Sequence, residues 1–231
     1  LSNLSDVTQV RKTCSELSRM VEEHRLDLFY DLRLYNVFSR VNSDFETYNS
    51  MDDVQKRYLS KILYEYERNG ACIEDDHVRM QILDKKKEIS RLALQFNRNV
   101  IEDTSHLTFT EEELTGLSKD DLSKFNKSDV DGRFIVMSKP TDINAIEKYA
   151  ILNHIRERAH KMIAQKCQDV NTAIFERVIQ LRNQVAQLLG YANHAEYILK
   201  IRMAQTSDHV SQFLDALEER VKPLEKREYH P

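Results

Sequence analysis

The chain has 231 residues, of which 31% are charged, and its formal net charge is −4. This length can bury a sizeable core in one large or two small domains. Because lysine and arginine residues are interleaved with acidic ones, we expect no nucleic acid partner and no binding to anionic lipid. No apolar run approaches the ~20 residues of a membrane-spanning helix, so we expect no membrane partner.

The distribution of glycine and proline predicts a helical fold class. The chain has only 4 glycines and 3 prolines, and none of them occurs before Gly70. Domains rich in β-structure or in linkers need these residues at their turns. The segment before Gly70 is therefore predicted to consist of long helices.

The three cysteines, Cys14, Cys72 and Cys167, are far apart, odd in number and in no C-x-x-C arrangement. Such a set is typical of reduced, structural thiols in a cytosolic type of compartment. The N-terminus lacks the basic and apolar regions of a signal peptide. We expect a cytoplasmic protein, with a mitochondrial location as the alternative.

Two helices are predicted before Gly70. In the first, apolar residues recur at spacings of three and four, which predicts a seam that lies against a neighbouring helix. The seam also contains His24, which we interpret as a hydrogen-bonded boundary residue rather than a ligand. Ser50 with Asp53 is predicted to start the second helix, which ends at Asn69 and Gly70. The seam of the first helix consists of Val7, Val10, Cys14, Leu17, Val21, His24 and Leu28.

A third long helix is predicted after the acidic residues Glu74, Asp75 and Asp76, which favour the positive end of a helix. Its apolar side extends to Val100. The lysine run 85–87 is predicted on the opposite, solvated face. A phosphate-binding role is not favoured, because adjacent helical lysines point in different directions and no glycine-rich loop accompanies them.

Helical periodicity fails between Asp103 and Lys139. Residues 106–109 and 133–137 are short alternating or β-branched runs, which predict a pair of strands. Between them, Thr110 with Glu113 and Ser118 with Asp121 fit the capping box, so each pair is predicted to start a short helix.

One helix is predicted from Thr141 to about Lys166, and two more from Asn171 to Ala204. The apolar residues of the first of these two stop at Gly190, a glycine C-cap, and the second begins at a capping box of Asn193 and Glu196. A final helix is predicted from residues 206–208 up to Pro223. The apolar residues that end at Gly190 are Ile174, Val178, Leu181, Val185 and Leu188.

The segment from Leu181 to Ala204, LRNQVAQLLGYANHAEYILKIRMA, resembles the N-terminal half of the thimet oligopeptidase, neurolysin and saccharolysin family of zinc oligopeptidases. Three further stretches resemble the same family in the same order, and together they cover nearly the whole chain. They are VTQVRKTCSEL from Val7, ERNGACI from Glu67 and ISRLALQFNRNVIEDTSHLTFTEEELTGL from Ile89.

Peptidases of this family bind zinc through His-Glu-x-x-His on a helix, and the chain has no such motif. His154 and His160 come nearest, but six residues turn a helix through about 600°, which leaves the rings roughly 120° apart. Arg158 stands where the inverted motif would need a histidine, and Glu196, near His194, is assigned to a cap. We therefore assign no catalytic, cofactor-binding or metal-ligating residue to this chain.

The predicted fold class is mainly α, with long antiparallel helices and a small β-strand pair, as the N-terminal part of a larger neurolysin-like two-domain peptidase. By the resemblance, residues 1–231 are a helical region that forms a wall of the substrate channel and is truncated at both ends. Residues 104–139 are interpreted as a small strand-containing insertion.

The resemblance implies a zinc metalloendopeptidase that hydrolyses short peptides, with its zinc ligands downstream of this chain. The expected partners are short peptide substrates and the C-terminal catalytic half of the same protein. The chain alone is then expected to be inactive. The alternative is a stand-alone helical scaffold or interaction domain without catalytic activity, and a downstream His-Glu-x-x-His would decide between the two.

Overall fold

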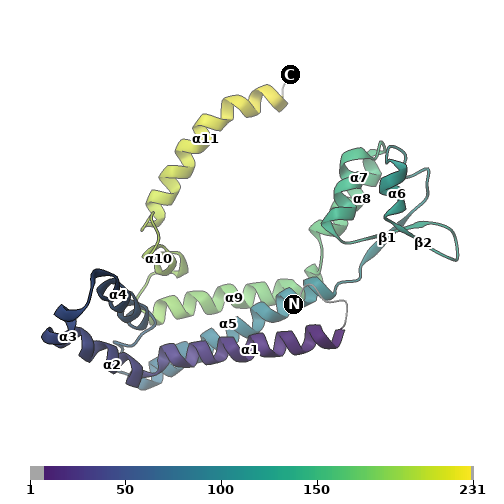
Figure 1. Ribbon diagram of the computed structural model, residues 1–231. Coiled ribbons are helices and arrows are strands. Elements are labelled where there is room, and N and C mark those ends of the chain that lie inside the picture. Colours follow the sequence, from purple (N-terminus) through teal and green to yellow (C-terminus); the bar gives the residue numbers. More distant parts are fainter. Residues whose placement is uncertain (1–7, 230–231) are drawn as a thin grey trace. The chain divides into compact units, whose positions relative to one another are not determined.

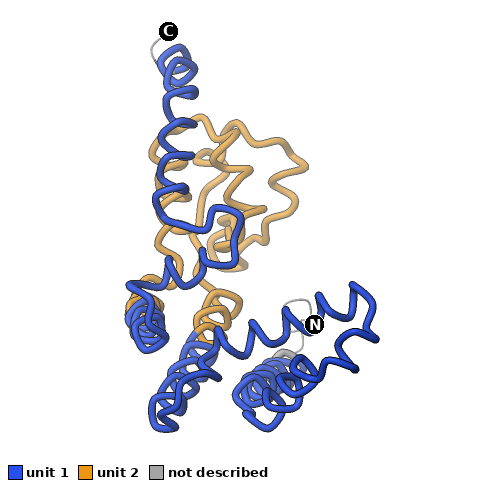
Figure 2. The backbone as a smooth tube through the Cα atoms, turned by 90° about the vertical axis from the view of Figure 1, so that its left-hand side faces the viewer, with its two compact units in different colours: residues 1–92, 177–231 blue, residues 93–176 orange. Residues whose placement is uncertain are grey.

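The structure is a computed structural model that describes residues 8–229. The chain divides into two compact units, which Figure 2 shows in different colours. Unit 1 contains residues 1–92 and 177–231, and unit 2 contains residues 93–176. The long helices α5 (Asp76–Glu102) and α9 (Gln168–Leu188) each begin in one unit and end in the other.

Unit 1 is helical throughout its described part (Figure 1). In α4, Tyr66 is only 4% exposed, and it packs against the rings of Phe29, Tyr35 and Phe38 from the preceding helices. Its hydroxyl donates a hydrogen bond to the Leu28 carbonyl (3.1 Å). The helices that lie wholly in unit 1 are α1 (Thr8–Tyr30), α2 (Leu32–Ser43), α3 (Phe45–Ser50), α4 (Asp53–Arg68), α10 (His194–Leu199) and α11 (Ser207–Tyr229).

The predicted apolar seam of α1 is not buried in this chain. Leu17 and Val21 are 55% and 68% exposed, and His24 is exposed as well, whereas the buried residue of α1 is Leu26. Val7, the first residue of the predicted seam, lies outside the described residues. The spacing of the seam predicts a face that lies against another helix, but the contacts of α4 with α1 are near the end of α1, where Tyr66 packs against Phe29 and donates to the Leu28 carbonyl. The seam is therefore not buried within the described residues.

The start of α4 (Asp53–Arg68) differs from the prediction by two residues. Residues 45–50 form the short helix α3, and the capping box consists of Asp52 and Gln55 instead of Ser50 and Asp53. The Asp52 carboxylate accepts from the Gln55 backbone N–H (2.8 Å), while the Gln55 side chain accepts from the Asp52 backbone N–H (3.0 Å). The end of α4 at Asn69 and Gly70 is confirmed.

The lysine run 85–87 lies on α5 (Asp76–Glu102), and its prediction as a solvated face was wrong. Each lysine reaches a different helix. Lys85 donates to the Gln184 side chain of α9 (2.9 Å), and Lys87 pairs with Asp27 of α1 (2.5 Å). Lys86 is largely buried and donates to the Asn69 side chain. The run therefore links α5 to its neighbours.

Unit 2 contains a three-stranded antiparallel sheet of order β1-β3-β2. The strands are β1 (His106–Phe109), β2 (Asn126–Lys127) and β3 (Phe134–Met137). The pair β1 and β3 is confirmed, with Phe109 opposite Phe134, while β2 was not predicted. Its two residues are too few to show an alternating pattern, and they pair only because the turn after them brings the chain back along β3.

Two capping boxes were predicted in this segment, and only one starts a helix. Ser118 caps α6 (Lys119–Ser123) through its hydroxyl. At the other, Thr110 and Glu113 do form the reciprocal hydrogen bonds (2.8 and 3.2 Å), but residues 111–116 make only turns. Gly116, with φ of +109°, ends this segment after a single turn.

The single helix predicted from Thr141 to Lys166 is two helices, α7 (Pro140–Tyr149) and α8 (Asn153–Ala164). At the break, the Ile151 N–H donates to the Thr115 carbonyl (3.0 Å), and the Arg156 guanidinium donates to the Ala150 carbonyl (2.6 Å). These hydrogen bonds take the place of the backbone hydrogen bonds that a continuous helix would make. Because they depend on Thr115 and on a side chain, the apolar spacing alone did not reveal the break. The two helices pack against β3 and β1 and bury the core of unit 2, which contains Phe109, Leu114, Phe125, Phe134, Val136, Ile143, Ile146, Ala150, Ile155 and Ala159.

The helix pair around Gly190 is confirmed. α9 (Gln168–Leu188) buries Leu181 and Val185, and Gly190 has φ of +83°. Asn193 caps α10 by accepting from the Glu196 N–H (3.0 Å). The Glu196 carboxylate, however, accepts from the Ser207 hydroxyl (2.7 Å), so it joins α10 to α11 instead of completing the capping box.

We expect Gly190→Val to destabilise the fold by about 1–2 kcal/mol, because a β-branched residue resists positive φ. No atom lies within 4 Å of the position that a Cβ at Gly190 would occupy, so the cost comes from the backbone alone. Urea unfolding measures the difference. Equal midpoints for variant and parent would show that the left-handed conformation is not needed there.

The last helix, α11, continues through Pro223, where the prediction ended it. A proline inside a helix removes one backbone hydrogen bond, and the helix can absorb that loss by bending. The predicted fold class is confirmed: the protein is mainly helical with one small sheet. None of the helices in residues 8–229 is both long and apolar enough to cross a membrane.

Candidate functional site

The two histidines that come nearest to a metal pair, His154 and His160, both lie on α8 and both are exposed. The His160 Nδ1 atom lies 2.8 Å from the Glu147 carboxylate of α7, which gives this ring a partner of its own. Across residues 8–229, no three His, Cys, Asp or Glu side chains come together as a metal site would require. The described residues therefore do not fit a zinc ion.

We expect the isolated chain to bind no stoichiometric zinc, because its donor side chains are dispersed. Metal analysis after dialysis against micromolar zinc, with a His154→Ala variant as the comparison, measures this. One zinc per chain that is lost on mutation of His154 or His160 would contradict the expectation.

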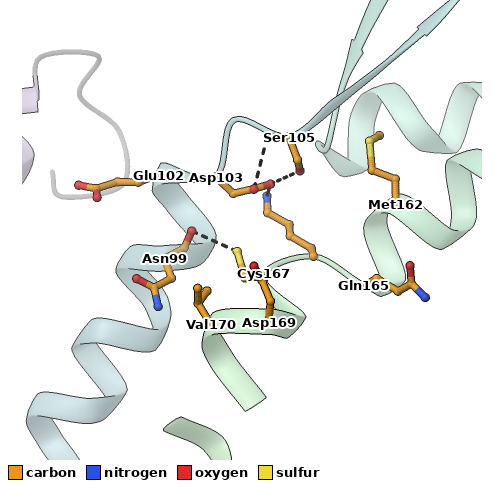
Figure 3. Close-up of a pocket in the computed structure, with 10 residues that line it drawn as sticks. Asn99, Glu102, Asp103, Ser105, Met162, Gln165, Cys167, Asp169 and Val170 are labelled. Atoms are coloured by element: carbon orange, nitrogen blue, oxygen red, sulfur yellow. Dashed lines mark hydrogen bonds and ion pairs between the residues drawn. The ribbon is translucent and has the colours of Figure 1, made fainter. Parts of the chain in front are cut away.

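A hollow in unit 2 has a volume of about 500 Å³ and lies where α5, α8 and α9 approach one another (Figure 3). Its lining comes from the end of α5, the turn after it, and the junction between α8 and α9. The lining residues are Asn99, Glu102, Asp103, Ser105, Met162, Gln165, Lys166, Cys167, Asp169 and Val170.

The turn after α5 forms one wall of this hollow. The Asp103 carboxylate accepts from the Ser105 hydroxyl (2.6 Å), an arrangement that favours a turn because it satisfies polar groups locally. Lys166 extends across the hollow to Asp103 (3.6 Å) and donates to the Ser138 carbonyl (2.9 Å). Figure 3 shows Asp103 and Ser105 in the turn that lines the hollow. The charged groups of Asp103 and Lys166 therefore stabilise this wall of the hollow.

Cys167 sits at the junction between α8 and α9 with φ of +55°, a conformation that non-glycine residues seldom adopt. Its thiol donates to the Asn99 carbonyl (3.3 Å). Burial raises the pKa of the Cys167 thiol, and the Asp103 carboxylate adds to the rise. Both the hydrogen bond and the raised pKa favour the protonated thiol, which agrees with the structural role predicted from the sequence.

Asn171 links the same junction to α5. It is 4% exposed, and its carbonyl oxygen accepts from the Asn99 side chain (2.8 Å) while its amide donates to the Phe96 carbonyl (3.3 Å). The contacts of Asp103, Lys166 and Asn171 therefore stabilise the turn and the junction. The hollow offers hydrogen-bonding groups, and those of Asp103, Lys166 and Cys167 are engaged in structural contacts.

Several oligopeptidases are similar in sequence to this chain over almost its whole length. Saccharolysin of Saccharomyces cerevisiae is 30% identical over 99% of the chain, and the thimet-like oligopeptidase of Dictyostelium discoideum is 26% identical over 99%. Residues 148–231 match the model of peptidase family M3. The chain is homologous to the family M3 oligopeptidases. The resemblance expected from the sequence is confirmed.

The chain spans about a third of the length of these relatives: 33% of saccharolysin and 34% of the thimet-like oligopeptidase. The oligopeptidase A of Salmonella typhimurium is more distant, at 21% identity over 99% of the chain, and it too is matched over 35% of its length. The homology thus connects this helical chain with one part of larger peptidases.

The sequence did not reveal a second polar cluster, which lies in unit 1 around Lys86. Its members come from α1, α4, α5 and α10, so no local motif contains them. Two of the stretches that carry the family resemblance supply residues to it: Arg68 and Asn69 belong to ERNGACI, and Tyr197 belongs to the segment from Leu181 to Ala204. In the sequence, these stretches indicated only helix ends and starts.

Proposed function

We propose that this chain is the N-terminal, helical part of a zinc-dependent endopeptidase that hydrolyses short peptides, and that it forms a wall of the substrate channel. The observation that carries the proposal is the match to saccharolysin and to the thimet-like oligopeptidase over 99% of the chain. The zinc ligands are then expected in the part of the protein outside this chain, because the described residues do not fit a metal site.

Exposed apolar side chains on two helices of unit 1 indicate a surface that a partner covers. Leu17 and Val21 of α1, and Phe213 and Leu217 of α11, are each between 47% and 68% exposed. On both helices these residues recur at helical spacing, so each forms a continuous apolar face, a feature that usually marks a contact surface. We propose the C-terminal catalytic half of the same protein as the partner that covers these faces.

In this proposal zinc supplies the chemistry, as a Lewis acid that activates water. The helical part contributes selection. A channel admits only a chain that can enter as a flexible strand, so short unstructured peptides are substrates and folded proteins are excluded. The proposed location is the cytoplasm, which accords with the reduced cysteines.

We expect the full-length protein to cleave a short flexible peptide at least about 100-fold faster than the same sequence built into a rigid, folded host, because a misplaced scissile bond alone costs about that factor. Cleavage of both substrates is measured by mass spectrometry with the zinc content held constant. Comparable turnover of the folded host would contradict the channel and favour an open cleft.

A tryptophan scan then tests whether α9 belongs to the wall. Ala173, Glu176, Gln180 and Gln187 are exposed on this helix, so bulky substitutions there should leave the fold intact. At least one is expected to slow cleavage of the flexible peptide without loss of zinc. Val130→Trp, at a position 96% exposed in the turn between β2 and β3, is the control. A scan without any effect would place the wall elsewhere.

A further inference from the structure

Lys86 lies at the centre of a buried cluster of cations and aromatic rings in unit 1. Its ammonium group donates to the Asn69 side chain and to the Tyr197 hydroxyl (3.4 Å). It also lies 5.7 Å from the centre of the Tyr30 ring and 5.6 Å from that of Tyr197. Tyr30 ends α1, Asn69 follows α4 and Tyr197 lies on α10, so three other parts of the chain converge on this lysine of α5.

Arg68 brings a second buried cation to the cluster. Its side chain is only 9% exposed, and its guanidinium lies 4.1 Å from the centre of the Tyr197 ring. One nitrogen, Nη2, donates to the Tyr197 carbonyl (3.3 Å). The Nε atom is buried and has no hydrogen-bond partner among the described residues. A buried charged N–H group without a hydrogen-bond partner lowers the stability of the fold, because it has lost its bonds to water and gained none in return.

The cluster has more donors than acceptors. The Tyr30 hydroxyl is buried and, like Arg68 Nε, finds no partner within residues 8–229. Lys86 has three N–H groups, of which two are used, and the Tyr197 hydroxyl accepts one of them, so its own hydrogen is free to be donated. The Tyr30 hydroxyl, Arg68 Nε and His194 Nδ1 thus have no hydrogen-bond partner among residues 8–229.

The cluster also has an excess of positive charge. Glu65 is the nearby acid, but it is 41% exposed and its carboxylate lies 3.8 Å from Arg68. Burial, with the positive charge of Arg68 beside it, lowers the pKa of Lys86 to about 8. Burial and the surrounding cations also lower the pKa of His194, so this ring is neutral. Arg25 also acts on Lys86, but its charge is paired with Glu22 (2.7 Å). With Arg68 and Lys86 positive and Glu65 negative, one positive charge is left over.

We propose that this cluster binds one carboxylate group, held by the Tyr30 hydroxyl, Arg68 Nε and the Lys86 ammonium group. A carboxylate brings one negative charge and two acceptor oxygens, which match the excess charge and the unused donors. A water molecule would satisfy donors but leave the charge, and a dianion would reverse it. The carboxylate comes either from a small molecule in solution or from an Asp or Glu side chain of the protein outside this chain.

The test uses the full-length protein and sodium acetate as the probe, with binding measured by saturation-transfer NMR on the acetate methyl group. Tyr30→Phe and Lys86→Met remove one donor each. Tyr58→Phe and Lys61→Met are matched controls on α4, because both positions are exposed. The melting temperature of each variant is recorded in a buffer without carboxylates.

For a carboxylate from solution, acetate binds saturably to the parent and the controls, and each cluster variant weakens binding about tenfold, the effect of one good hydrogen bond. For a side chain of the protein itself, acetate does not bind, but Tyr30→Phe lowers the melting temperature by several degrees relative to Tyr58→Phe. Either result supports the site. Two results overturn it: acetate binding that the cluster variants leave unchanged, or no acetate binding together with a Tyr30→Phe variant as stable as the parent.

Discussion

Gly116→Ala is expected to destabilise unit 2 by about 4 kcal/mol or more, because the added methyl group has no space and the backbone conformation opposes it. A Cβ at this position would lie 2.1 Å from the Tyr149 carbonyl oxygen and 3.0 Å from the Ile151 side chain. The φ angle of +109° disfavours alanine independently of these contacts. To relieve the overlap, the segment around Gly116 would have to move away from the end of α7, and the hydrogen bond from Ile151 to Thr115 (3.0 Å) would break.

Gly132→Ala is the matched control for this prediction. Gly132 also has positive φ, +68°, but no atom lies within 4 Å of its Cβ position. Its substitution is expected to cost only about 1 kcal/mol, the backbone term alone. Urea unfolding of both variants separates the two terms. If the two midpoints coincide, the close approach of Gly116 to Tyr149 does not determine the stability of unit 2.

Phe109→Ala is expected to cost about 3–5 kcal/mol, the usual range for removing a fully buried aromatic side chain. Phe109 is 0% exposed at the end of β1, within the core that the sheet forms with α7 and α8. The Arg158 guanidinium lies 4.8 Å from the centre of its ring and pairs with Glu113 (3.2 Å). The substitution therefore leaves a cavity and also removes the surface on which Arg158 rests.

Phe45→Ala provides the comparison, because Phe45 is 80% exposed on α3. Its removal is expected to change the free energy of unfolding by no more than about 0.5 kcal/mol. Calorimetric unfolding of the two variants measures the difference. Similar losses in both would show that the core of unit 2 does not depend on Phe109.

The helices whose faces are buried within the chain were predictable. In α9, Leu181 and Val185 are buried and Gly190 closes the helix, as the sequence indicated. This prediction succeeds because helical periodicity, glycine caps and side-chain caps depend on residues within a few positions of one another. The strand pair β1 and β3 was found for the same reason, through local alternation and β-branched residues.

Predictions failed where a distant contact decided the outcome. The break between α7 and α8 depends on Ile151 bonding to Thr115, and the single turn after β1 depends on the conformation of Gly116. The seam of α1 has the spacing of a buried face, yet Leu17 and Val21 are exposed in this chain. Apolar spacing shows that a face is suited to burial, but not which element covers it.

The sequence by itself determined that the protein is mainly helical, where several of its helices begin or end, and that it resembles a family of oligopeptidases, because these features depend on local order along the chain. The tertiary structure alone decided that Arg68, Tyr30 and Tyr197 gather around Lys86, and that the Cys167 thiol donates to the Asn99 carbonyl. Burial and charge neighbours depend on which helices meet, and residues far apart in sequence meet only after the chain has folded.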